Sequence, residues 1–189
     1  FLRSMSISIY NSPIVIIDFN GYYDPSRKFT IRELYIVSST LDPSERRVDK
    51  HIVFKEWRNW KEWPKRNLIN LKKYLLDYGI PLNREDSYPN QKKYLMKILN
   101  KDSIIFVETT VKKIILRTII GKDYNIESLS TLKYQPDHKR GMMYACQFHT
   151  DEGKRNCARA QGILMRQWFS SDRNQLAVSF RQKHTQLSR

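Results

Sequence analysis

Pro13-Ile-Val-Ile-Ile-Asp18-Phe-Asn20-Gly21 is a continuous run of mainly β-branched residues that ends in a turn. Such a run is typical of a central strand that is buried on both faces. Two further segments with strand character follow, at residues 28–38 and 48–55. Three neighbouring strands with short connections favour an antiparallel meander. The first run is therefore the expected centre of a β-sheet.

The remainder of the chain alternates between helical and strand patterns. Helices are predicted at residues 65–78, 91–99, 111–120 and 156–169. Short strands are predicted at residues 103–107 and 124–129, and a loop at 133–145. This order is that of the ribonuclease H-like fold. The expected fold class is thus α/β, with a mixed sheet of three antiparallel strands extended by parallel strands and flanked by helices.

Length and composition predict one folded domain. We expect it to occupy residues 13–171, after an N-terminal extension at 1–12 and before a basic, flexible tail at 172–189. No apolar run approaches the roughly 20 residues that span a bilayer. The first residues also lack the long apolar segment of a signal peptide. The sequence therefore predicts an intracellular protein, cytoplasmic or nuclear, without membrane contact.

The net charge of +15 is the strongest compositional signal. A chain this basic repels itself unless a polyanion offsets the charge, and nucleic acid is the usual polyanion. An ordinary soluble basic surface is the alternative.

The two cysteines of the chain lie beside a histidine, in the pattern Cys146-x2-His149-x7-Cys157. Three such side chains can bind one zinc ion, although a closed tetrahedral site needs a fourth ligand. Buried reduced thiols and a Cys146–Cys157 disulfide are the other two interpretations.

Parts of the sequence resemble two known protein families. Asp18-Phe-Asn20 resembles the Asp-x-Glu strand of DnaQ-type (DEDD) exonucleases, and Asn156-Cys-Ala-Arg-Ala-Gln161 resembles their closing helix, but amides stand where acids or a base belong. One remaining carboxylate cannot hold the two metals of such a site. The resemblance therefore implies the fold without the exonuclease activity, and no catalytic residue is assigned.

Maelstrom-type domains are the second resemblance, through Arg32-Glu33-Leu34-Tyr35 and the C-terminal Cys-His-Cys-Ala cluster. The sequence is also similar to small insect and insect-virus proteins with such a strand and cluster. This resemblance implies a Zn²⁺ site formed by Glu33, Cys146, His149 and Cys157, and a role in RNA silencing or antiviral RNA biology. A buried strand carboxylate does need a partner or a metal. The alternatives are that Glu33 faces solvent, or that Asp18 or Glu108 supplies the oxygen ligand.

Binding of nucleic acid, RNA rather than DNA, is the expected function, and a homodimer is left open. Single-strand-specific ribonuclease activity and interaction with acidic proteins are the alternatives. The aromatic residues could stack on bases or form a packing ledge under the first helix. The expected nucleic-acid-binding residues are Lys112, Lys113, Lys139, Arg140, Lys154, Arg155, Arg159, Trp60 and Trp63.

Overall fold

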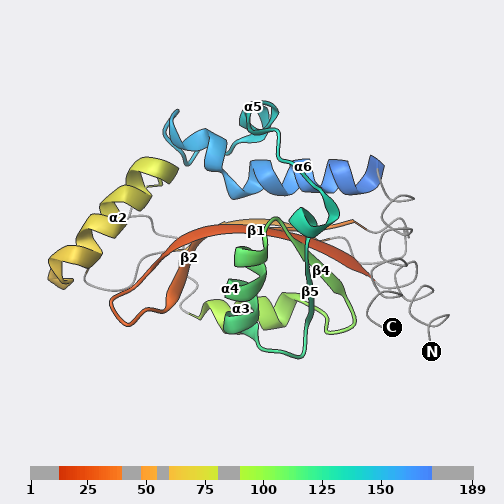
Figure 1. Cartoon of the computed structure of the whole chain (residues 1–189), viewed down its shortest axis with the longest axis horizontal. Helices are drawn as coiled ribbons and strands as arrows, with labels where there is room; N and C mark the ends of the chain where they lie inside the picture. The colour runs from red at the N-terminus through yellow and green to blue at the C-terminus, as the bar shows by residue number, and fades with distance from the viewer. Residues whose placement is uncertain (1–12, 40–47, 55–59, 81–89, 172–189) are drawn as a thin grey trace.

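A computed structural model describes residues 13–39, 48–54, 60–80 and 90–171 of the protein (Figure 1). Its sheet has five strands in the order β3-β2-β1-β4-β5. Strand β1 pairs antiparallel with β2, and β2 with β3, whereas β4 and β5 continue the sheet in parallel. The predicted α/β fold class is confirmed. The strands are β1 (Ile14–Tyr23), β2 (Phe29–Ser38), β3 (Asp49–Val53), β4 (Ile104–Val107) and β5 (Asn125–Ser128).

Helices cover both faces of this sheet. The α-helices are α2 (Lys65–Tyr78), α3 (Gln91–Ile98), α4 (Thr110–Ile120), α5 (His138–Gly141) and α6 (Ala158–Ser171). Short 3₁₀ helices join them, namely η1 (Trp60–Glu62), η2 (Leu129–Leu132), η3 (Met142–Tyr144) and η4 (Gly153–Asn156). None of the helices in the described ranges has the length and apolar character needed to cross a membrane.

Alternation along β1 divides the core into two layers. Val15, Ile17 and Phe19 face α3 and α4, whereas Ile14 and Ile16 face α6. Figure 1 shows α6 above the sheet and the two other helices below it. Asp18 and Asn20 continue the second set, so β1 turns two buried polar side chains toward the α6 layer.

Three details of the predicted elements are wrong. The segment 133–145 is not one loop, because it contains α5 and η3. The last helix begins at Ala158 rather than 156, since Cys157 is extended and ends η4. Helical periodicity places Leu68, Leu71, Leu75 and Leu76 on one face of the helix at 65–78. In the structure Leu76 is 77% exposed, because Leu71 and Tyr74 define the buried face of α2.

Two irregularities bring the α6 layer close to β2. A bulge shifts the register between β1 and β2, so Asn20 pairs with Glu33 while Gly21 pairs with Ile31. Gly162 lies against Tyr35, where a Cβ would be 2.3 Å from the tyrosine Cδ1. The missing side chain lets α6 approach the strand, with its N-terminus beside Glu33.

Candidate metal centre

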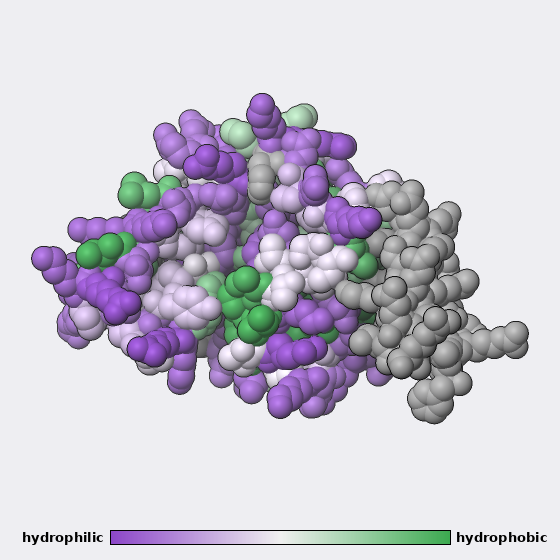
Figure 2. All heavy atoms as spheres, in the orientation of Figure 1, coloured by the Kyte–Doolittle hydropathy of each residue, from purple (hydrophilic) through white to green (hydrophobic). Residues whose placement is uncertain are grey.

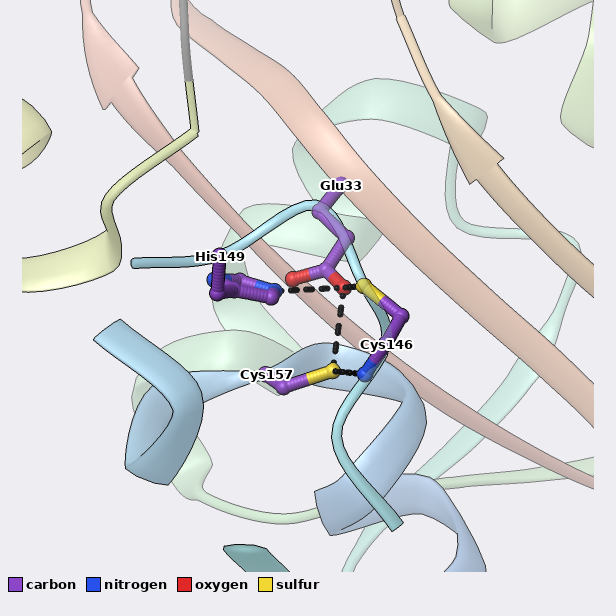
Figure 3. A group of neighbouring side chains, drawn as sticks. All are labelled: Glu33, Cys146, His149 and Cys157. Atoms are coloured by element: carbon purple, nitrogen blue, oxygen red, sulfur yellow. Dashed lines mark hydrogen bonds and ion pairs between the residues drawn. The ribbon is translucent and has the colours of Figure 1, made fainter. Parts of the chain in front are cut away.

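Four buried side chains converge between β2 and the start of α6 (Figure 3). Glu33 comes from β2, Cys146 follows η3, His149 lies in the next loop, and Cys157 joins η4 to α6. Their ligand atoms all lie within 4.8 Å of one another. These are the four residues predicted from the sequence, and together they could hold a metal ion.

The Glu33 carboxylate lies at distances from the other three groups that are close to those in a tetrahedral zinc site. From Glu33 Oε1, the distances are 3.1 Å to His149 Nε2, 3.3 Å to Cys157 Sγ and 3.7 Å to Cys146 Sγ. Zinc bond lengths place tetrahedral ligand atoms roughly 3.4–3.7 Å apart. The three distances from Glu33 Oε1 therefore lie within a few tenths of an ångström of this range.

Hydrogen bonds orient the Glu33 carboxylate. Its Oε2 accepts a bond from the Ala158 backbone N–H at 2.9 Å, at the first turn of α6, and another from Asn20 Nδ2. Its Oε1 is left to face the thiols and imidazole. Burial raises the pKa of Glu33, but bonds from His149, His51 and Ala158 outweigh it, so the net shift is downward and the group stays ionised.

A backbone carbonyl orients His149. Its Nδ1–H donates to the Tyr78 carbonyl at the end of α2, so Nε2 is the nitrogen that faces Glu33 and could bind a metal once it is deprotonated. Gly79 adopts a left-handed conformation there (φ 64°), and its carbonyl accepts a bond from the Thr150 N–H at 3.3 Å. A Cβ on Gly79 would collide with Thr150. The C-terminus of α2 therefore fixes the imidazole.

The two cysteines are free and buried, so the disulfide interpretation is not supported. The Cys146 backbone N–H donates to Cys157 Sγ at 3.4 Å, a contact that favours a thiolate. The hydrogen bond between the two side chains lowers the pKa of Cys146 and raises that of Cys157.

His51 is a site residue that sequence reasoning missed. Its Nε2 lies 2.8 Å from Glu33 Oε1, and its ring stacks on Phe148 with the centroids 5.7 Å apart. Strand β3 places His51 opposite Tyr35, two residues from Glu33. Asn20 was noted only for lacking a charge, yet its Oδ1 accepts a bond from the Tyr74 hydroxyl at 2.9 Å. The only signal in the sequence for His51 was a histidine on a predicted strand next to the strand that carries Glu33.

Asp18 and Glu108, the rival oxygen donors, belong to a different cluster. Lys112 Nζ lies 2.5 Å from Asp18 Oδ1 and 2.8 Å from Glu108 Oε2. Burial lowers the pKa of Lys112, but the two carboxylates raise it by more than burial lowers it, so the net shift is upward and the ammonium stays charged. The side chain of Lys112 thus supplies a positive charge between Asp18 and Glu108.

The residues expected to bind nucleic acid fall into three groups. Lys113 pairs with Glu127 at 2.8 Å, so the two α4 lysines, Lys112 and Lys113, are both engaged by carboxylates of other elements. Trp60 and Trp63 pack in an apolar cluster, with Trp63 in edge contact with Tyr22, which supports the packing-ledge interpretation. The others lie on α5, η4 and α6, and these are Lys139, Arg140, Lys154, Arg155 and Arg159.

Comparison with known proteins adds no identity. The chain matches no protein-family model and no curated protein.

We predict that the stabilisation by bound metal grows with pH. Burial lowers the pKa of His149, but bonds with Cys157 and Glu33 raise it to about 10. In metal-free protein this shift adds stability below pH 6.5 that is lost as the pH rises toward 10. A metal instead needs deprotonated ligands, so its contribution is lost as the pH falls.

The Tm difference between metal-loaded and chelator-treated protein should therefore increase from about pH 6 to about pH 8. Thermal unfolding followed by circular dichroism measures it. A difference that is constant or shrinks over this range contradicts metal binding at these four groups.

Proposed function

We propose that the protein is a zinc-stabilised ribonuclease H-like module that binds nucleic acid, RNA rather than DNA, and does not hydrolyse it. The observation that carries this proposal is the buried cluster of Glu33, Cys146, His149 and Cys157. Three of these side chains, those of Glu33, His149 and Cys157, are also held by hydrogen bonds to the backbone. The same ligand set is implied by the resemblance to Maelstrom-type domains, which is also the basis for RNA and for a role in RNA silencing or antiviral defence.

Zinc is the metal that suits these ligands best. Two thiolates and an imidazole are soft or borderline donors, which magnesium and calcium avoid and zinc prefers. Four protein ligands close a tetrahedral zinc ion and leave no position for an activated water. Zinc here would tie α6 and the loop before it to the sheet.

Lys112 supports the absence of nuclease activity. Its ammonium fills the space between Asp18 and Glu108, where a divalent cation would have to bind. Asn20 cannot replace a missing acid, because its amide is engaged by Glu33 and Tyr74. A two-metal hydrolytic mechanism needs carboxylates free to bind both ions.

Elemental analysis should find one zinc per chain, and Cys157→Ser should abolish it. The variant should also lose about 3–4 kcal/mol of zinc-dependent stability when free zinc is roughly 100 to 1,000 times Kd. Glu108→Gln is the matched control and should retain zinc, because Glu108 binds Lys112. A chain that holds no zinc, or loses it equally in both variants, contradicts the assignment.

In the presence of magnesium or manganese, neither the unchanged protein nor the Asp18→Asn variant should cleave RNA. Product is measured by gel electrophoresis of end-labelled RNA. A metal-dependent product made by the unchanged chain and lost in the variant would show that a hydrolytic site exists and would overturn the inactive assignment.

RNA binding should weaken steeply with salt. If about four phosphates are neutralised, affinity for a single strand should fall roughly fiftyfold over a fourfold rise in salt. Fluorescence anisotropy with a labelled RNA gives the slope. A flat salt dependence, or binding to acidic protein but not to RNA, favours the protein-interaction alternative.

A further inference from the structure

The outer surface of α5, η3, η4 and α6 forms one basic face, which we call the upper face. Between residues 138 and 171 there are six lysines and arginines against two carboxylates. Arg140, Arg155 and Arg166 are exposed, and none forms an ion pair with a described carboxylate. Figure 2 shows hydrophilic residues along this upper edge of the molecule.

The α3 side of the molecule is also basic, but it differs in chemistry. Its exposed cations on α3 are the lysines Lys92, Lys93 and Lys97. The upper face instead has arginines, whose planar guanidinium binds phosphate through two hydrogen bonds. An extended polyanion is therefore expected to prefer the upper face.

Tyr144 adds an aromatic group to the arginines. Its hydroxyl accepts a bond from Gln167 at 3.2 Å, and Gln167 and Arg140 both lower its pKa. Its carbonyl accepts a bond from Arg159 at 2.9 Å, which links η3 to α6. A half-buried tyrosine among arginines suits the stacking of an unpaired base, unlike the packed tryptophans of η1 and the loop after it.

The upper face depends on the metal centre for its order. From residue 142 to 157 the chain has only two short 3₁₀ helices. Its buried residues there are Cys146, His149, Gly153 and Cys157. Three of these four are candidate metal ligands, so the metal centre supplies most of the buried side chains of the segment that carries Tyr144 and Arg155. Its other anchors are individual contacts, such as the bond from Asn156 Nδ2 to the Asp77 carbonyl at 2.7 Å.

We infer that the upper face is the binding surface for single-stranded RNA and that metal binding and RNA binding are thermodynamically coupled. This inference rests on the proposed function. When the metal orders segment 142–157, the cations of the upper face are fixed in position to bind phosphate, and the affinity of the protein for RNA rises. Bound RNA must then raise the affinity of the protein for the metal by the same factor.

The experiment measures both sides of this linkage in the full chain. Anisotropy with a short labelled single-stranded RNA should give an affinity about tenfold or more weaker in chelator-treated protein than in zinc-loaded protein. Competition with a chromophoric chelator should show zinc held more tightly by the same factor when RNA is saturating.

Two charge-matched variants locate the surface. Arg155→Glu with Arg166→Glu should abolish RNA binding and the protection of zinc by RNA, while zinc content stays unchanged. Lys92→Glu with Lys93→Glu alters the net charge equally on α3 and should preserve both. Equal losses in the two variants would mean that binding follows overall charge, and would overturn the assignment of the surface.

Other outcomes separate this inference from the function on which it rests. If zinc-loaded protein binds no RNA, the proposed nucleic-acid function fails. If RNA binds equally with and without zinc, that function stands and the coupling is wrong. Hydrogen exchange should show opening of segment 142–157 on chelation with β1 still protected, and loss of protection throughout the sheet would overturn a local coupling.

Discussion

The buried carboxylate of Glu33 is the constraint on which the α6 side of the structure depends. It is fully buried within a sheet, where an ionised group is destabilised by several kcal/mol unless it is compensated. The first turn of α6, the Asn20 amide and two imidazoles all direct donors at it. The N-terminus of α6, the register shift between β1 and β2 and, through His149, the end of α2 all meet at this one acid.

Two clusters on this face of the sheet solve the same problem in different ways. At Asp18 and Glu108 the compensating charge belongs to the chain, because Lys112 inserts its ammonium between the acids. At Glu33 no lysine or arginine is among the described bonding partners, and the nearby groups are histidines and thiols. Histidine and cysteine side chains are groups through which a metal ion could supply the compensating positive charge, since neutral imidazole and thiolate both coordinate metals.

The sequence was informative wherever a signal was local. Helical periodicity predicted α2 with its observed bounds. The cysteine–histidine spacing predicted three residues of the cluster, and the resemblance to Maelstrom-type domains implied Glu33 as the fourth. His51 and Tyr74 were not predictable, because only sheet register and helix packing bring them to Glu33 and Asn20. The pairing of Lys112 was missed for the same reason, since 94 residues separate it from Asp18.

Three of the four cluster residues lie in segment 142–157, which has little regular structure. A helix or strand is held by its own backbone bonds and an apolar face, whereas segment 142–157 has neither over most of its length. Its cysteines are instead the centre of a small apolar cluster with Ala160, flanked by Tyr144 and Phe148. Because the same residues supply the packing and the candidate metal ligands, a metal bound there would stabilise this segment directly.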